Sequence, residues 1–314
     1  MRLQSLPALS LLFASLSLFV TSTMLHAQPA GGASNEPTDP PAASGAALSL
    51  KTDAKPDIPV DTKPAMARQT GLPIDELDGV LEKYRKSGNR EAEGHTLGAI
   101  AGSYRALHQQ QKALELYQLA LTIWREIGNK DDEATTLAHI GDVYREWGFH
   151  EQAIHFYRDA LKVYPTSTDK SELAAVFNNL GLAYFGLHDK KKCLENLDHA
   201  LAEYRAKQDR QGEASVLTNL GSAYAFLGND PHKSLDYFQE AVTKLELLND
   251  RSSEANAFNV MGLVWLKLQN QDMAIQSFQR ALFLFGRTGN AQGEASARKQ
   301  LQAITQTETI ASAR

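Results

Sequence analysis

A five-fold internal repeat is the feature of this sequence that most constrains its fold. One aromatic position recurs at Tyr104, Tyr144, Tyr184, Tyr224 and Trp265, in steps of 40, 40, 40 and 41 residues. A period between roughly 20 and 50 residues is typical of arrays in which each copy covers the apolar face of the next. The sequence therefore predicts stacked copies of one unit over residues 74–306.

The spacing of small and bulky residues inside each copy indicates helices. Three residues before the aromatic position stand Ala101, Gly141, Gly181, Gly221 and Gly262, and an alanine recurs at Ala120, Ala160, Ala200, Ala241 and Ala281. Spacings of 3, 4 and 7 residues mark one face of a helix. Each copy is predicted to hold two antiparallel helices, for example 131–147 and 151–164, which approach closely at the small residues.

Helix-boundary signals agree with this prediction. Glutamates recur at one position in the first turn of four of the five first helices and of the closing helix, where an anion favours the helix dipole: Glu93, Glu133, Glu213, Glu254 and Glu294. Gly-Asn pairs such as Gly128-Asn129 are suited to end one helix and cap the next. We expect the turn at 228–231 to absorb the one extra residue of the fourth copy.

The pattern aliphatic-Gly-x-x-Tyr, followed by Ala-x-x-x-Phe/Tyr-x-x-Ala, resembles the tetratricopeptide repeat, whose usual period is about 34 residues. The longer period is similar to that of kinesin light chain and of repeats found beside caspase-like CHAT domains. The resemblance implies an all-α, right-handed solenoid of helical hairpins with five full repeats. A leading half-repeat is expected at 74–87 and a closing helix at 291–305, followed by a flexible tail at 307–314.

The residues before the array predict export. A single basic residue, Arg2, precedes an apolar stretch at 6–25, and Ala27 offers a small residue for cleavage, so residues 1–27 are predicted to be a signal peptide. The alternative is that residues 6–25 stay uncleaved as a membrane anchor. Residues 28–73 are rich in Pro and Ala and are predicted to be a disordered linker. Both alternatives direct the array to the periplasm or cell envelope.

Composition and motifs argue against several functions. A formal net charge of −5 does not favour nucleic-acid binding, and a single cysteine excludes a disulfide framework. His150 and His155 are separated by five residues, so they diverge on a helix and cannot share a metal ion. Cys193 occupies a small packing position. We therefore predict no catalytic residues, no cofactor and no metal site.

In the tetratricopeptide fold the first helix of each pair lines a concave groove. The resemblance therefore implies a peptide-binding groove, for which we select these residues: Arg105, Asp142, Arg145, Asn178, Asn179, Phe185, Asn219, Ser222, Phe226, Asn259 and Leu263. Asparagine amides can bond the backbone of an extended peptide, and exposed Phe and Leu side chains can receive apolar anchors. The alternative is that the apolar members pack against the next repeat and that the asparagines are simply solvated.

These observations predict a non-enzymatic scaffold or adaptor of the cell envelope that binds a segment of another protein. The alternative is a regulatory or sensor partner of a separate enzyme, such as a CHAT-type protease, which rests on repeat type alone. An enzyme with an unrecognised site in the groove is the third hypothesis. The sequence names neither the partner nor the oligomeric state.

Overall fold

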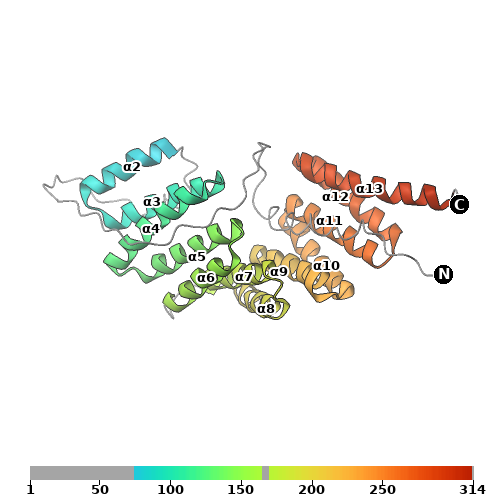
Figure 1. The fold of residues 1–314 in the computed structure, drawn as a ribbon, viewed down its shortest axis with the longest axis horizontal. Helices are drawn as coiled ribbons and strands as arrows, with labels where there is room; N and C mark the ends of the chain where they lie inside the picture. Colours follow the sequence, from blue (N-terminus) through green and yellow to red (C-terminus); the bar gives the residue numbers. More distant parts are fainter. Residues whose placement is uncertain (1–73, 165–169, 313–314) are drawn as a thin grey trace. The chain divides into compact units, whose positions relative to one another are not determined.

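The computed structural model describes residues 74–164 and 170–312, and these residues are helical apart from the short turns between helices (Figure 1). The first six helices are α2 (Ile74–Ser87), α3 (Arg90–Ala106), α4 (Gln110–Ile127), α5 (Lys130–Glu146), α6 (His150–Val163) and α7 (Lys170–Gly186). The others are α8 (Lys190–Lys207), α9 (Arg210–Ala223), η2 (Tyr224–Gly228), α10 (Pro231–Leu248), α11 (Arg251–Lys267), α12 (Gln271–Thr288) and α13 (Ala291–Ser312). The predicted all-α repeat fold is confirmed.

The chain divides into two compact units. The N-terminal unit contains the described residues up to 183, and the C-terminal unit contains those from 184 onward. Within the N-terminal unit each helix from α2 to α6 packs on the next, and the same holds from α8 to α13 in the C-terminal unit. The signal peptide predicted for 1–27 and the linker predicted for 28–73 lie outside the described residues.

The boundaries of the helices follow the predicted capping signals. Gly128 ends α4 in the left-handed conformation with φ 73°. The Asn129 side chain then caps α5 by accepting a hydrogen bond from the Asp132 amide at 3.1 Å. Asn89 and Asn290 cap α3 and α13 in the same way. These interactions satisfy amides that lack a partner in the first turn of a helix.

The small residues allow the helices of a hairpin to approach. A Cβ atom placed on Gly141 would lie 2.7 Å from the Tyr157 ring. The corresponding distances are 2.9 Å from Gly221 to the Phe238 ring and 2.6 Å from Gly262 to the Phe278 ring. Because all three rings are fully buried, each glycine supplies space that a larger residue would occupy.

The first-turn glutamates have a second role that the sequence did not indicate. Glu93, Glu133 and Glu213 are buried, and each pairs with the arginine eight residues earlier, at the end of the preceding helix. The Arg125 Nε to Glu133 Oε1 distance, for example, is 2.9 Å. The glutamate thus joins consecutive hairpins in addition to favouring its own helix dipole.

The extra residue of the fourth repeat lies earlier than we expected. Instead of being absorbed by the turn at 228–231 alone, it widens the end of the first helix into the π-helix η2. The Asp230 amide donates to the Tyr224 carbonyl at 3.1 Å, which closes this widened end, and Asn229 adopts a left-handed conformation. A one-residue insertion in a helix is commonly accommodated as a π-turn.

The closing helix is longer than predicted. We expected it to span 291–305, whereas α13 continues to Ser312. The segment from Gln306 to Ser312 contains neither proline nor glycine, so no residue there interrupts the helix.

Candidate functional site

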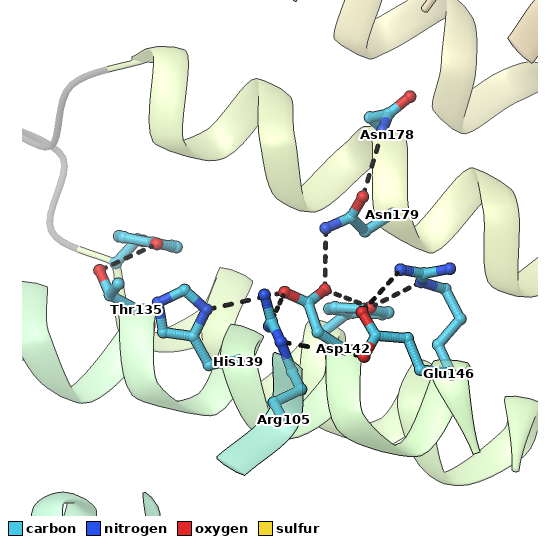
Figure 2. A network of polar contacts seen from close by, with 10 residues as sticks. Arg105, Thr135, His139, Asp142, Glu146, Asn178 and Asn179 are labelled. Atoms are coloured by element: carbon cyan, nitrogen blue, oxygen red, sulfur yellow. Dashed lines mark hydrogen bonds and ion pairs between the residues drawn. The ribbon is translucent and has the colours of Figure 1, made fainter. Parts of the chain in front are cut away.

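Five of the residues selected from the sequence meet in one polar network in the N-terminal unit (Figure 2). Arg105 comes from α3, Asp142 and Arg145 come from α5, and Asn178 and Asn179 come from α7. These are the first helices of three consecutive repeats. We call the side of α3, α5 and α7 that carries this network the first-helix face.

The network is built by a constant offset between neighbouring first helices. Arg105 contacts Asp142, and Asp142 contacts Asn179, each 37 residues further along the chain. His95 with Asp132 and Thr135 with Glu172 show the same separation. The separation of 37 is three fewer than the period of 40. A residue therefore contacts a side chain that lies three positions, almost one helical turn, before its own equivalent in the next repeat.

Asp142 is the centre of the network and has a full set of hydrogen bonds. Its carboxylate accepts from Tyr157 Oη at 2.7 Å, from Asn179 Nδ2 at 2.9 Å and from Arg105 Nη1 at 3.0 Å. Burial by itself would raise the pKa of Asp142, but the nearby His139 ring and two guanidinium groups outweigh it and hold that pKa well below its usual range. Asp142 is therefore an ionised, structurally fixed carboxylate.

Glu146, one turn further along α5, is bonded less well. Its Oε1 atom is buried and has no hydrogen-bond partner. The nearest cationic atoms are Arg145 Nη2 at 3.6 Å and Arg105 Nε at 3.8 Å. Burial raises the pKa of Glu146, and the two guanidinium groups offset this only in part. Two carboxylates thus share two guanidinium groups unequally.

The network also contains side chains that were not selected from the sequence, among them Glu146, Tyr157 and His139. Tyr157 occupies the Phe/Tyr position of the repeat pattern, and its hydroxyl donates to Asp142 because Gly141 lets the ring approach α5. His139 Nδ1 lies 3.6 Å from Asp142 Oδ2. The sequence did contain a signal for the tyrosine. The Phe/Tyr position of the repeat pattern is a tyrosine only in the first two repeats, Tyr117 and Tyr157, and these are also the repeats with charged groove positions.

The groove residues selected in the C-terminal unit are less exposed than we expected. The buried ones are Phe185, Asn219, Ser222 and Asn259. Phe226 and Leu263 are half-buried and pack against clusters of core residues. The expectation that phenylalanines are exposed on this part of the array was therefore wrong for Phe185, which is 7% exposed. These apolar side chains therefore pack between helices, as the alternative interpretation of the sequence predicted.

The polar members of this group also differ from the N-terminal set. Ser222 Oγ donates to the Thr218 carbonyl of its own helix at 3.0 Å, so it bonds its own backbone. Asn219 is 1% exposed, and the Asn259 Oδ1 atom is buried without a hydrogen-bond partner. These amides have little surface to offer a ligand in this conformation.

Cys193 shows no sign of reactivity. It is buried, and burial raises the pKa of its thiol to about 12, which keeps it protonated. Within residues 74–164 and 170–312, no three His, Cys, Asp or Glu side chains gather in a way that would hold a metal ion. No helix in that part of the chain is long and apolar enough to span a bilayer.

The comparison with protein families decides the classification. The model of the tetratricopeptide repeat matches residues 76–166 and 172–246, which is more than half of the chain. The chain belongs to the tetratricopeptide repeat family. This family is in general a non-catalytic interaction fold, so the chain is a helical repeat scaffold of the protein-binding type. Among curated protein sequences no match is found.

Solved structures show the same fold in other tetratricopeptide repeat arrays. The chain superposes on BtubC (BKLC) from P. vanneervenii with a TM-score of 0.62 at 21% identity, covering 73% of this chain and 93% of the other. A Rap protein complexed with competence and sporulation factor gives 0.55 at 15% identity, covering 74% and 69%. The kinesin light chain TPR-like repeats of Podosopora anserina give 0.52 at 13% identity, covering 62% and 96%. The predicted likeness to kinesin light chain is confirmed at the level of the fold.

Proposed function

We propose that the N-terminal unit binds a segment of a partner protein against its first-helix face. The observation that carries this proposal is the charged network on that face. Its members are held by one another at defined distances, yet Arg105, Asp142 and Glu146 keep 20%, 13% and 18% of their side-chain surface exposed. Polar groups that are fixed before binding lose little entropy on contact with a ligand.

Within residues 74–164 and 170–312, the state of the titratable groups supports a binding role over an enzymatic one. The most strongly shifted carboxylate, Asp142, has its hydrogen bonds satisfied within the protein. The family is in general non-catalytic, and a Rap protein with this fold has been crystallised with competence and sporulation factor. Both observations favour a protein or peptide ligand for this chain.

The binding test uses residues 28–314 and a displayed library of random peptides. Asn178 is half-buried on α7 and bonds Asn179, so we choose Asn178→Ala as the variant of the first-helix face. Leu119→Ala is the control, since Leu119 is 50% exposed on the second helix α4. We expect selected peptides to bind Asn178→Ala at least about tenfold more weakly, the loss of one or two hydrogen bonds. If both variants lose affinity for the peptides equally, or if neither loses affinity, the result contradicts the proposal.

We also propose that the protein acts in the cell envelope after export. The support is the sequence of residues 1–27, with one basic residue before an apolar stretch and a small residue at Ala27. The measurement is the mass of the mature N-terminus from cells. A chain that begins at Gln28 supports cleavage, an intact chain in the membrane supports the anchor, and an intact chain in the cytosol contradicts export.

A further inference from the structure

A cluster of aromatic rings surrounds the turn between the two helices of the second repeat. Trp147 and Phe149 flank the turn residue Gly148, and their rings meet at 84° with centroids 5.3 Å apart. The Phe149 ring also meets the Tyr144 ring at 80°, and Tyr144 stacks on Phe156 at 5.3 Å. Trp147, Phe149 and Phe156 are half-buried, so the cluster is partly open to solvent.

The repeat fold does not require these rings. At the position of Trp147 the other four repeats have leucine, and at the position of Phe149 they have polar residues. Asp189, Asp230 and Asn270 occupy this second position, and each caps the following helix by accepting a hydrogen bond from a backbone amide. Phe149 makes no side-chain cap. An aromatic ring therefore stands where three other repeats have a stabilising cap.

The chemistry of the cluster favours proline as a ligand. The exposed surface of the rings is mainly aromatic carbon, which does not satisfy a backbone N–H that is removed from water. Proline is apolar and has no backbone N–H, so it can cover the rings without leaving a donor unpaired. Proline-rich segments bind aromatic-lined surfaces in other proteins, because their extended backbone is largely ordered before binding.

Segments of this kind precede the array in the same chain. Residues 37–40 and 56–59 both read Pro-x-x-Pro, and Pro41 extends the first of them. Prolines three residues apart lie on the same side of a polyproline II helix, which has three residues per turn. The first segment therefore offers the larger apolar side to a row of aromatic rings.

The chain is long enough for the first segment to reach the cluster. The described residues begin with α2, and the cluster lies on α5 and α6 and the turn between them in the same N-terminal unit. Each helix from α2 to α6 packs on the next, and four such steps of about 8–10 Å amount to about 40 Å at most. Residues 40–74 span about 100 Å when extended. Residues 59–74 span only about 45 Å, which leaves the second segment little slack.

We propose that residues 37–41 of the same chain dock on the aromatic cluster of the second repeat. The proline rings cover exposed surface of Trp147 and Phe149, and the linker is thereby held against the N-terminal unit. This inference goes beyond the proposed function, because no residue of the polar network on the first-helix face belongs to the cluster.

The test places a nitroxide label in the linker and follows the indole N–H signals by NMR. Residues 28–314 carry Thr38→Cys for the label and Cys193→Ala, since alanine occupies the equivalent position in other repeats. A docked label should broaden the Trp147 signal selectively. Trp124 and Trp265 are internal references, because Trp124 is almost fully buried and Trp265 lies in the C-terminal unit.

Two variants of the labelled chain remove the two sides of the contact. Phe149→Asp introduces the residue that caps the equivalent helix in the third and fourth repeats, so it should keep the fold, which circular dichroism checks. Its control is Gln109→Asp, which places aspartate at the equivalent position of the first repeat without removing a ring. The second variant combines Pro37→Ala, Pro40→Ala and Pro41→Ala and leaves the array unchanged.

A tethered segment is present at an effective concentration in the millimolar range, so a contact of millimolar affinity is formed about half of the time. We expect the Trp147 signal of the labelled chain and of Gln109→Asp to be about twofold weaker than in Phe149→Asp and in the proline variant. Equal Trp147 signals in all four chains overturn the inference. A difference that disappears on dilution also overturns it, because docking then occurs between copies. If Phe149→Asp unfolds, the proline variant decides alone.

Discussion

Asp142 and Glu146 lie one turn apart on α5, yet their surroundings shift their pKa values in opposite directions. Asp142 accepts three hydrogen bonds and has a lowered pKa, whereas Glu146 Oε1 accepts none and has a raised pKa. The difference arises from the number of donors within reach, since both side chains are largely removed from water. Asp142 is therefore held by hydrogen bonds, whereas Glu146 Oε1 is buried and has only more distant cationic neighbours.

Replacement of Asp142 by asparagine should destabilise the N-terminal unit strongly. The change leaves Arg105 without its closest anionic partner, which we expect to lower the free energy of unfolding by about 3–5 kcal/mol. Urea unfolding monitored by circular dichroism measures it. Glu146→Gln is the matched comparison, and we expect it to change stability by less than about 1 kcal/mol, because little hydrogen bonding is lost. Equal losses for the two variants would contradict the unequal sharing of donors.

The effect of Asp142→Asn should depend on pH. Because the folded pKa of Asp142 lies below the value of about 3.9 for an unfolded aspartate, its ionised form contributes stability that is complete above that value and is lost as the pH falls toward the folded pKa. The gap between wild type and variant should therefore shrink below about pH 4. Glu146 has the opposite sign, so the stability of Glu146→Gln relative to wild type should rise above about pH 4.3. Unfolding curves recorded from pH 3 to pH 7 test both slopes.

The packing between the two helices of a hairpin depends on single small residues. Gly141 admits the Tyr157 ring, and this approach also brings the tyrosine hydroxyl to Asp142 at 2.7 Å. A packing residue on one helix thus positions a polar group of the first-helix face. The same geometry at Gly221 and Gly262 accommodates phenylalanine rings, which carry no hydroxyl.

Alanine at Gly141 should cost stability, whereas alanine at Gly98 should increase it. A Cβ atom at Gly141 would lie 2.7 Å from the Tyr157 ring, and overpacking of this kind costs about 1–3 kcal/mol. Nothing lies within 4 Å of a Cβ atom at Gly98, so the higher helix propensity of alanine should stabilise α3 by about 0.5–1 kcal/mol. Thermal unfolding of the two variants compares them directly. A stabilising Gly141→Ala would show that the Tyr157 ring moves without cost.

The ion pair between the second helices of the last two repeats has its charges in the opposite order to the ion pair between the preceding two second helices. Arg205 on α8 pairs with Glu240 on α10, whereas Glu246 on α10 lies 3.9 Å from Arg280 on α12. Arg280 also pairs with the buried Glu254 of α11, so the arginine partner of this first-turn glutamate comes from the following helix instead of the preceding one. The reversal keeps opposite charges together at both contacts, and a repeat moved by one position would bring like charges together.

At the level of the whole array, the last described helix, α13, covers apolar side chains of α12. In the C-terminal unit, Ile304 of α13 packs in one cluster with Phe278 of α12, and the Phe285 ring lies against Gly293. Both phenylalanines are almost fully buried. The polar residues Gln302 and Thr305 lie exposed on the same helix, as expected for a solvated cap.

Truncation at two positions should show that the part of α13 up to Ile304 is needed to cover α12 and that the part after Thr305 is not. Ending the chain at Gly289 uncovers Phe278 and Phe285, each worth about 1.5–3 kcal/mol of burial, and should cause aggregation or loss of helix in α12. Ending it at Thr305 keeps Ile304 and should leave the solution behaviour unchanged. Size-exclusion chromatography and circular dichroism distinguish these outcomes. A monomeric, fully helical chain that ends at Gly289 would show that α12 needs no cover.

The periodic spacing of small, aromatic and acidic residues was sufficient to predict the family, the hairpins, the capping of α5 and α13 by asparagine and the packing role of Gly141. These properties follow from helical geometry and from short-range contacts, which are encoded within one repeat. The partners of individual side chains depend instead on the offset of 37 residues between first helices and on burial across neighbouring repeats. For that reason the tyrosine hydroxyl at Asp142, the burial of Phe185 and Asn219 and the unsatisfied oxygen of Glu146 became visible only in three dimensions.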